Sequence, residues 1–489
     1  MTRNTHKNKT IDNNKKIRVL AYGDSTRCST GFGTVMRGIF NNLAKTGRYD
    51  IQIFGINDQG FLDPDPVKYP YKILPAMIPG QTDDFYGRLR FLNIVRGADN
   101  NLKPPWDIIF TLNDPFIFEQ PVLSPDKGMM DVIVELLKLY KEKLPPQNWV
   151  KTVSYWPIDS YIKENWVEHA IGLADYSVAY TEYGKAEIEK SNQKLSKPMK
   201  FNLDVIYHGT DTTAFHPIPE KEKMEFKKMY FQRARIEPET TYIVGVVARN
   251  QMRKDIPRAM RIFKEFQKRR PDSMLYIHAK EQDVWGSLSE YARNFNLELG
   301  KDWIFPGNFS ENQGYPIDVL NKIYNVMDVQ ISASNGEGWG LPITEAMSAK
   351  VLNIAPNITS IPELFNTQGN NYEDVTQLET AEIRGIPVKA GSNSSEWTTF
   401  GPVDYERVRP LTNVDDAVKK LIWAYDNKEK AQKIVDRAYE WVQKYSWTNI
   451  AKEWDTYFQM VYNKLEEERK NASTKSTDQS DQPEFSKSK

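Results

Sequence analysis

Strand-like apolar runs alternate with helical stretches along most of the chain, and this alternation limits the possible folds more than any other feature. A first series of runs falls at residues 17–23, 51–56, 106–112, 150–155 and 176–180, with helical patterns at residues 34–43 and 130–143 between them. A second series falls at residues 242–248, 274–278, 303–306, 329–333 and 351–355. Strands that alternate with helices are typical of parallel sheets covered by helices. The sequence therefore predicts an α/β protein with two such sheets.

The stretches outside the two series predict the domain boundaries. Charge and proline are concentrated around residues 216–228, which is typical of a link between domains. The last stretch, NASTKSTDQSDQPEFSKSK, has almost no apolar side chains and cannot repay the entropy of ordering. Residues 366–410 are rich in Gly, Asn and Ser and predict an insertion beside the second domain. We expect a flexible N-terminus (residues 1–16), a first domain (17–215), a second domain (216–440), an aromatic-rich helix (441–468) and a disordered tail (469–489).

Charge and cysteine content exclude several function classes. Lys plus Arg and Asp plus Glu both number 65, so no overall field draws the chain to nucleic acid or to an acidic membrane. Basic runs at residues 88–96 and 185–200 leave local contacts with nucleic acid open. The one cysteine, Cys28, cannot form an internal disulfide, which fits a reducing compartment. Because neither a signal peptide nor a membrane-spanning apolar run is present, we expect a cytoplasmic protein without a transmembrane segment. Nothing in the sequence indicates the oligomeric state.

The segment SNGEGWGLPITEAM, residues 334–347, combines a glycine-rich turn, a helix start and two carboxylates. It follows a predicted strand, and Pro342 suits the first helical position, where its missing amide hydrogen costs nothing. Backbone amides and the helix dipole make such a turn an anion site. We place Glu337 in the loop and Glu345 in the first turn of the helix, where its carboxylate can accept hydrogen bonds from a diol. The segment therefore predicts one site for a sugar and a phosphate.

Two basic residues, Arg249 and Lys254, follow the predicted strand at residues 242–248. Ligands of open α/β sheets bind at the carboxyl ends of the strands. Fixed cations in a dry site at that point can stabilise the negative charge of a phosphate. Arginine can grip a phosphate bidentately, and lysine acts as a point charge. A pair of solvated surface residues is the alternative interpretation.

The loop GDSTRCSTGFGT, after the first predicted strand, invites comparison with a dinucleotide-binding loop. Met36 stands where the third glycine belongs, and the second strand ends without a clear ribose-binding acid, so a dinucleotide-dependent oxidoreductase is disfavoured. Asp63 and Asp65 imitate an Asp-x-Asp metal site, but prolines interleave them and no apolar strand precedes them. The five histidines show no pair at metal-ligand spacing. We therefore expect no metal site.

Four segments together resemble a known family. They read EGWGLPITEAMSAKVLNIAPNITSIPEL, VVARNQMRKDIPRAM, VIYHGTDTTAFHP and LADYSVAYTEYGK, and they stand in the family's order. The chain from about residue 17 to 465 is thereby similar to the retaining nucleotide-sugar glycosyltransferases of GT-B architecture, in particular glycosyltransferase family 4 (glycosyl transferases group 1). The resemblance implies two Rossmann-like domains facing a cleft, with a C-terminal helix that crosses back to the first domain.

The resemblance also assigns roles to residues. It implies that Arg249 and Lys254 clamp the leaving phosphate, that Glu337 contacts the transferred sugar beside the reacting carbon, and that Glu345 holds the ribose. The other donor-binding residues implied are Gly31, Gly33, Asn308, Gly338, Trp339, Gly340 and Leu341. Where many family members have a histidine that touches the donor sugar, this chain has Asn113 and Asp114, which with Asp159 become candidates for the acceptor side. A tight turn without a ligand is the alternative for Gly31 and Gly33.

The implied activity is transfer of a hexose from a nucleoside diphosphate sugar of the UDP-glucose or GDP-mannose type, without a cofactor or metal. A glycan, a small molecule, a protein and a nucleic acid are all open as acceptors. Two alternatives use the same fold, a nucleic-acid-modifying glucosyltransferase and a nucleotide-sugar epimerase or non-catalytic relative. The presence of Arg249, Lys254, Glu337 and Glu345 argues against a non-catalytic relative.

Overall fold

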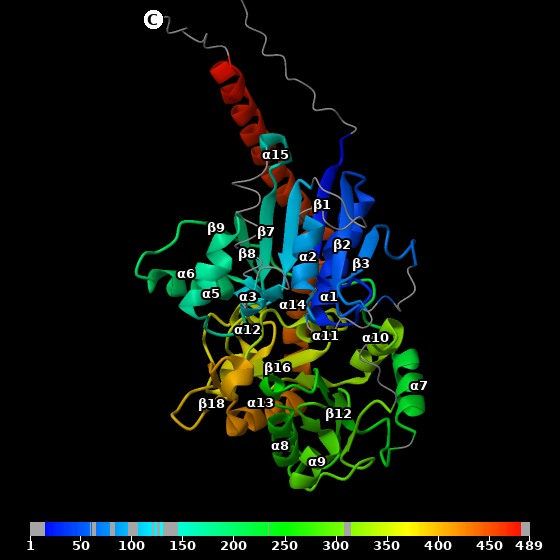
Figure 1. The fold of residues 1–489 in the computed structure, drawn as a ribbon. Helices are drawn as coiled ribbons and strands as arrows, with labels where there is room; N and C mark the ends of the chain where they lie inside the picture. The colour runs from blue at the N-terminus through cyan, green and yellow to red at the C-terminus, as the bar shows by residue number, and fades with distance from the viewer. Residues whose placement is uncertain are drawn as a thin grey trace, which may run out of the picture.

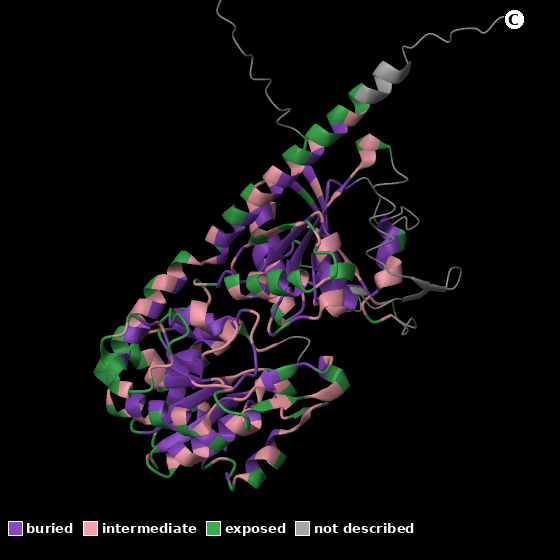
Figure 2. Cartoon of the chain, turned by 90° about the vertical axis from the view of Figure 1, so that its left-hand side faces the viewer, coloured by how far each residue is buried: buried purple, intermediate pink, exposed green. Residues whose placement is uncertain are grey.

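The computed structural model describes residues 15–58, 60, 65–78, 84–95, 106–119, 122–124, 128–130, 145–232, 234–307 and 314–480. These residues form two α/β domains, one above the other, and a long C-terminal helix that runs along the first domain (Figure 1). Buried side chains fill both sheets, and the outward faces of the helices are exposed (Figure 2). The arrangement confirms the predicted α/β fold with two Rossmann-like domains.

The first domain is built on a parallel sheet of seven strands in the order β3-β2-β1-β4-β7-β8-β9. Helices pack on both faces, so its central strands are near-continuous apolar runs, and every residue of β4 is buried. The strands are β1 (Ile17–Asp24), β2 (Tyr49–Ile56), β3 (Lys72–Pro75), β4 (Ile108–Leu112), β7 (Lys151–Trp156), β8 (Tyr176–Ala179) and β9 (Asn202–Val205). The helices are α1 (Gly31–Lys45), α2 (Arg88–Val95), α3 (Pro115–Glu119), α5 (Glu164–His169) and α6 (Glu182–Gln193), with 3-10 turns η1 (Pro146–Asn148) and η2 (Ile171–Leu173). A separate ribbon pairs β5 (Val122–Ser124) with β6 (Gly128–Met130), and residues 131–143 of the helix predicted at 130–143 lie outside the described residues.

The second domain is built on a parallel sheet of six strands in the order β14-β11-β10-β15-β16-β17. Its strands are β10 (Tyr242–Val247), β11 (Ser273–His278), β14 (Trp303–Ile304), β15 (Val329–Ile331), β16 (Leu352–Pro356) and β17 (Ile386–Val388). Two hairpins lie outside this sheet, β12 (Gln282–Asp283) with β13 (Gly286–Ser287), and β18 (Trp397–Thr399) with β19 (Val408–Pro410). The helices are α7 (Glu220–Tyr230), α8 (Ile256–Gln267), α9 (Leu288–Asn294), α10 (Ile317–Val326), α11 (Leu341–Ser348), α12 (Ile361–Phe365), α13 (Val414–Asp426) and α14 (Lys428–Lys444), with 3-10 turns η3 (Met252–Lys254), η4 (Val375–Glu379) and η5 (Gly401–Asp404).

Both sheets reverse their strand order at one point. In the first sheet β1 lies between β2 and β4, and in the second β10 lies between β11 and β15. Loops at the carboxyl ends of such strands diverge and leave room for a ligand. The loop after β15 meets the loop after β7, because a Cβ on Gly336 would lie 2.1 Å from the carbonyl oxygen of Asp159. The carboxyl ends of the two sheets therefore face each other.

The segment at residues 366–410 is only in part an insertion. Strand β17 pairs with β16 at the edge of the second sheet, so it belongs to the domain itself. All three residues of β17 are buried, although the flanking Gly, Asn and Ser residues suggested a loop. The hairpin of β18 and β19 leaves the sheet and forms a separate feature.

The chain returns to the first domain through α15 (Trp447–Ser480). The side chains of Trp454 and Phe458 lie in the first-domain core, with ring centroids 5.4 and 6.0 Å from Phe110. The predicted crossing helix is therefore present, but it begins at Trp447 and continues beyond residue 468, where we placed its end. One anchor near that point is Arg469, whose Nη1 lies 3.0 Å from Oδ1 of Asp107. Of the predicted disordered tail, residues 469–480 are helical, and residues 481–489 lie outside the described part of the chain.

Candidate active site

Glycine shapes the loop that joins β15 to α11, residues 332–340. Gly336 and Gly340 have φ angles of 153° and 101°, which residues with a Cβ rarely adopt. Helix α11 then begins at Leu341 with Pro342 in its first turn. The strand, turn and helix start therefore lie where the sequence predicted them.

The predicted residues Lys254 and Glu337 form a direct ion pair. Nζ of Lys254, at the end of η3, lies 2.5 Å from Oε1 of Glu337, and both side chains are only 12% exposed. Burial raises the pKa of Glu337, but the charges of Lys254 and Arg253 outweigh burial and hold the pKa below its usual value. Burial and the charge of Arg253 lower the pKa of Lys254 to about 8, against the opposing effect of Glu337. Glu337 is therefore an ionised carboxylate, and the neighbouring Lys254 loses its proton more easily than an ordinary lysine.

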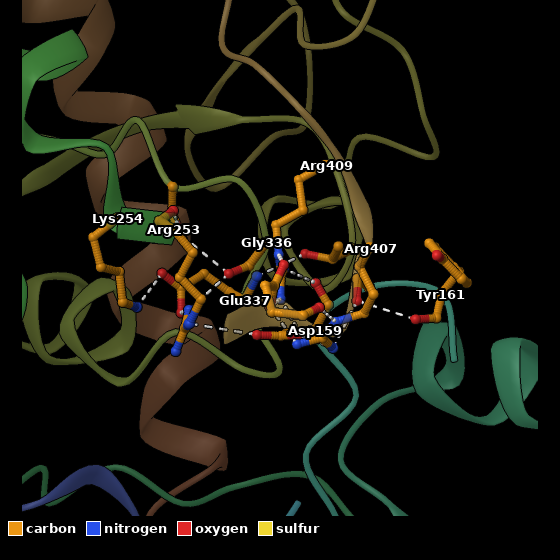
Figure 3. Close-up of polar contacts among 12 residues, drawn as sticks. Asp159, Tyr161, Arg253, Lys254, Gly336, Glu337, Arg407 and Arg409 are labelled. Atoms are coloured by element: carbon orange, nitrogen blue, oxygen red, sulfur yellow. Dashed lines mark hydrogen bonds and ion pairs between the residues drawn. The ribbon is translucent and has the colours of Figure 1, made fainter. Parts of the chain in front are cut away.

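Arg253, which the sequence analysis missed, completes this cluster (Figure 3). Its Nη1 donates a hydrogen bond of 2.9 Å to the carbonyl oxygen of Gly336 and lies 3.6 Å from Oε2 of Glu337. Its Nε lies 3.5 Å from Oδ2 of Asp159 in the first domain. The signal available in the sequence was its position directly before Lys254 in NQMRKD. That position does not reveal contacts with residues more than eighty positions away.

Arg249 follows β10 and is more accessible than Lys254. Its side chain is 54% exposed, and its Nε lies 3.6 Å from Oδ2 of Asp283. Burial raises the pKa of Asp24 at the end of β1, and the charge of Arg249 opposes that rise. Arg249 therefore acts electrostatically on the first domain.

Glu345 lies at the fifth position of α11 rather than in the first turn, where the sequence analysis placed it. The dipole effect falls off within the first turn, so it contributes little here. Burial raises the pKa of Glu345 to about 7, and the hydrogen bond from Tyr324 opposes the rise. That bond joins the Tyr324 hydroxyl in α10 to Oε2 of Glu345 over 2.7 Å. The carboxyl group is thus held in place by a residue that the sequence did not single out.

A small cavity lies at the carboxyl ends of β10 and β15. Its lining includes both members of the ion pair and the start of α11, namely Ala248, Lys254, Ala333, Glu337, Gly340, Pro342 and Ile343. The cation, the carboxylate and the glycine turn that the sequence singled out therefore border one space, at the point where ligands of such sheets bind.

The two glycines of the first-domain loop have different surroundings. A Cβ on Gly31, the first residue of α1, would lie 3.8 Å from Cδ1 of Leu341, so this glycine faces the start of α11. A Cβ on Gly33 would lie 2.7 Å from the carbonyl oxygen of Cys28 and 2.8 Å from that of Ser25. The turn that contains Gly33 therefore leaves no room for a side chain at that position, whereas Gly31 faces the second domain.

Trp339 and Gly338 also lie at the contact between the domains. The ring of Trp339 is buried, with its centroid 5.2 Å from that of Tyr207 and 5.6 Å from that of His208. A Cβ on Gly338 would lie 3.5 Å from Cδ2 of Tyr180. Trp339 thus packs on the segment that links the domains.

The three acceptor-side candidates differ in charge state. Oδ1 of Asn113, after β4, accepts the backbone N–H of Asp114 over 2.9 Å. Burial, together with the charge of Asp159, raises the pKa of Asp114 to about 7. Burial also acts on Asp159, but Arg409, Arg253 and Arg407 outweigh it and hold that pKa far below its usual value. Asp114 therefore holds its proton to a much higher pH than an ordinary aspartate, and Asp159 is an ion-paired carboxylate.

The remaining predictions concern metals, Asn308 and membranes. Across the described ranges no group of three or more His, Cys, Asp or Glu side chains is placed to hold a metal ion. Oδ1 of Asp65 accepts the backbone N–H of Val67 in its own turn over 2.9 Å, and Asp63 and Asn308 lie outside the described residues. None of the helices searched in the described part of the chain is both long and apolar enough to span a bilayer.

Comparisons with known proteins agree with this geometry. Residues 230–373 match the family described as Glycosyl transferases group 1. The fold is similar to that of sucrose-phosphate synthase from Thermosynechococcus elongatus, with a TM-score of 0.62 and 13% identity over 92% of this chain and 100% of that one. It is also similar to Anabaena HepE in complex with UDP and glucose (TM-score 0.58, 12% identity, 91% of this chain and 100% of that one). A third similar structure is an α,α-trehalose-phosphate synthase (UDP-forming) from Burkholderia vietnamiensis (TM-score 0.60, 10% identity, 91% and 97% covered). No curated protein sequence matches the chain.

The chain therefore has the GT-B architecture, with two Rossmann-like domains whose carboxyl-end loops face each other. Its second domain carries the Glycosyl transferases group 1 match, and the protein is an enzyme of the glycosyltransferase class.

Proposed function

We propose that the protein transfers a hexose from a nucleoside diphosphate sugar to an acceptor hydroxyl with retention of anomeric configuration, as the resemblance to glycosyltransferase family 4 suggests. One observation carries the proposal: Lys254, Glu337 and the start of α11 border the same cavity at the carboxyl ends of β10 and β15. A cation and a helix N-terminus can stabilise the negative charge of a leaving diphosphate, and a carboxylate can accept hydrogen bonds from sugar hydroxyls.

In this proposal Arg249, Lys254 and the first amides of α11 stabilise the departing phosphate. Lys254 is already ordered by Glu337 at 2.5 Å, so little reorganisation is needed when the donor arrives. The diphosphate then competes with Glu337 for the ammonium group. Oxygens of Glu337 become available to accept hydrogen bonds from the transferred sugar.

The acceptor hydroxyl loses its proton to the leaving phosphate on the same face of the sugar. The two ion-paired carboxylates, Glu337 and Asp159, have lowered pKa values and are poorly suited to carry that proton. Because the leaving phosphate takes the proton, the proposal invokes no dedicated protein base. Because cations surround the phosphate site, the proposal also requires no metal ion.

Glu345 holds the ribose hydroxyls of the donor in this proposal. Two of the similar structures are named with UDP, so UDP-glucose is the first donor to test and GDP-mannose the second. The acceptor is a glycan, a small molecule, a protein or a nucleic acid. The last step of the experiment below tests these four classes one by one.

The experiment measures thermal stabilisation of the purified protein by UDP, GDP, ADP and their sugars, with and without EDTA. A donor that binds the native state raises the melting temperature by mass action. We expect a selective shift with one nucleotide that EDTA does not remove, and slow release of sugar from the matching donor. Acceptors of the four classes are then added, and the anomeric configuration of the product is read by NMR. The absence of a shift and of sugar release with every donor would contradict the proposal.

A further inference from the structure

The hairpin at residues 397–410, named the strap from here on, joins the second domain to the first. Its base belongs to the second domain, where β18 pairs with β19. Its tip rests on the first domain, with the ring of Tyr405 centred 4.4 Å from Phe116 and 5.5 Å from Trp166. Tyr405 and Glu406 have φ angles of 55° and 54°, a costly conformation for residues with a Cβ. Surrounding contacts must therefore hold the tip in this shape.

Two arginines of the strap grip Asp159, which follows β7 of the first domain. Nη1 of Arg407 and Nη2 of Arg409 each lie 3.2 Å from Oδ1 of Asp159. Asp404, also in the strap, holds both arginines from the other side at 2.6 Å. The Arg409 side chain is fully buried, and without Asp159 the single carboxylate of Asp404 would have to balance both arginine charges.

Asp159 connects the strap to the phosphate site (Figure 3). Its second oxygen, Oδ2, lies 3.5 Å from Nε of Arg253. Arg253 in turn donates to Gly336 and lies 3.6 Å from Glu337, which is paired with Lys254. A continuous series of charged groups thus leads from the strap through one first-domain residue to the ion pair.

A direct backbone contact supports the same connection. A Cβ on Gly336 would lie 2.1 Å from the carbonyl oxygen of Asp159 and 2.8 Å from Nη1 of Arg409. The β15–α11 loop, the loop after β7 and the strap therefore meet at one point. Glycine at position 336 permits this close approach.

We infer that Asp159 is a positioning residue: held by the strap, it fixes Arg253 from the first-domain side and completes the phosphate site when the two domains are closed. The inference rests on the proposed function and deepens it. It gives Asp159 a role other than the acceptor contact expected from the sequence, and it leaves Asn113 and Asp114 as the acceptor-side candidates. Without Asp159, the Arg253 guanidinium keeps its contacts with Gly336 and Glu337 alone and competes with Lys254 for Glu337.

The kinetic test compares Asp159→Asn with a matched control in the strap. Asp159→Asn keeps the shape of the side chain and removes its charge. We expect kcat with UDP-glucose as the probe donor to fall by about 100-fold, the scale of a misplaced reacting group. The Kd of UDP should change less than about threefold, because the cations that bind phosphate remain. Glu406→Gln removes an ion pair with Lys163 (3.1 Å) that also crosses between the domains and lacks a link to Arg253, so its kcat should stay at the wild-type value.

A second variant separates positioning from folding. Arg253→Lys keeps the charge but cannot bridge Asp159 and Gly336, so it should lose kcat to the same degree as Asp159→Asn. The double variant should lose little more than either single variant, because both break the same connection. A lowered melting temperature with wild-type kcat in both single variants would overturn the inference.

Small-angle X-ray scattering supplies a readout that does not depend on catalysis. Asp159→Asn should have a larger radius of gyration than the wild type and Glu406→Gln, because the closed arrangement loses its link. If the wild type turns over no nucleotide sugar, the proposed function fails, and scattering alone decides the inference. An unchanged radius of gyration in Asp159→Asn would then refute it.

Discussion

At the scale of single residues, the ion pair of Lys254 and Glu337 is central to the proposed chemistry. A buried lysine keeps its charge only with a partner, and Glu337 provides one at 2.5 Å. A leaving diphosphate offers a stronger partner, with more charge and more acceptor oxygens. The pair therefore keeps the ammonium group ordered until the donor arrives.

Replacement of the cations is expected to slow the reaction strongly. Lys254→Ala and Arg249→Ala should each reduce kcat by roughly 100-fold to 1000-fold, the scale of losing one preorganised donor. Sugar release and transfer from the best donor provide the measurement. Arg249 is 54% exposed, so Arg249→Ala should leave the melting temperature nearly unchanged, which separates its effect from unfolding. Wild-type turnover in both variants would exclude the clamp.

The raised pKa of Glu345 predicts a pH dependence of stability. The native carboxyl stays protonated up to a pKa of about 7, whereas the unfolded one ionises near 4.5. Between these values the native state binds more protons, so the unfolding free energy falls as pH rises through this window. Glu345→Gln removes this contribution, and its stability relative to the wild type should increase from pH 5 to pH 7.5.

Urea denaturation of both proteins at pH 5, 6, 7 and 7.5 measures this difference. Asp114→Asn should show the same trend at a site in the first domain, because burial and the charge of Asp159 also raise the pKa of Asp114 to about 7. Parallel curves of stability against pH for Glu345→Gln and wild type would contradict the assigned pKa. Calorimetry of UDP binding to the same variant tests the ribose contact independently.

Residue-level prediction located side chains that stand next to a strand end in the sequence, and their roles stay predictions. Lys254 and Glu337 each follow a strand that flanks the reversal of the second sheet, so pattern and spacing were enough to find them. Arg253 and Tyr324 could not be found in this way, because their partners are distant in the chain. Glu345 was found, but its helix position was not, since a loop pattern does not fix the residue at which a helix begins.

At the scale of elements, the glycine in the middle of α1 shows how the C-terminal helix docks. A Cβ on Gly38 would lie 2.2 Å from the Trp447 ring, so the ring occupies the space that the missing side chain leaves. A Cβ on Gly209, in the link between the domains, would lie 2.6 Å from the same ring. Trp447 is therefore fitted between α1 and the link.

Gly38→Ala is expected to destabilise the first domain. The added methyl group must displace the Trp447 ring, and overpacking of this kind costs about 1–3 kcal/mol in unfolding free energy. Gly31→Ala in the same helix is the control for stability, since its Cβ would lie 3.8 Å from the nearest atom, within ordinary contact distance. Chemical denaturation measures both. Equal stability of the two variants would show that Trp447 moves aside at no cost.

The strands were predictable as elements because helices cover both faces of each sheet, which leaves uninterrupted apolar runs. The strap and the end of α15 could not be predicted in this way. The strap has only short strands and gains its shape from first-domain partners such as Phe116 and Trp166, which no local pattern reveals. The end of α15 carries few apolar residues, and its ion pair of Arg469 with Asp107 joins positions that are far apart in the chain.

At the scale of the whole molecule, the described residues provide three connections between the domains besides the link at residues 206–216 and the contacts around the candidate active site. One is the strap, and another is α15. The third is Glu363 in α12, whose carboxylate accepts the backbone N–H groups of Glu182 and Tyr183 at the start of α6, at 3.0 and 2.7 Å. Because these connections lie on different elements, the loss of one should loosen the closed arrangement while the others keep the domains joined.

The most consequential of the three for folding is α15, because its side chains complete the first-domain core. Trp454, Phe458, Val461 and Leu465 are all fully buried. A chain that ends at residue 453 loses all four, and one such loss alone costs about 3–5 kcal/mol for Trp or Phe. The total is comparable to the whole of the roughly 5–15 kcal/mol that stabilises a typical domain. We therefore expect the first domain of this truncated chain to be unfolded.

The second domain should survive the same truncation, since α13 and α14 belong to its own core and remain present. Limited proteolysis with mass spectrometry should then yield a resistant fragment that begins near residue 216. A chain that ends at residue 470 is the control, because it keeps the four buried side chains and Arg469, and it should resist proteolysis like the full chain. A resistant first domain in the chain ending at residue 453 would mean that its core closes without α15, and that the helix only fastens one finished domain to the other.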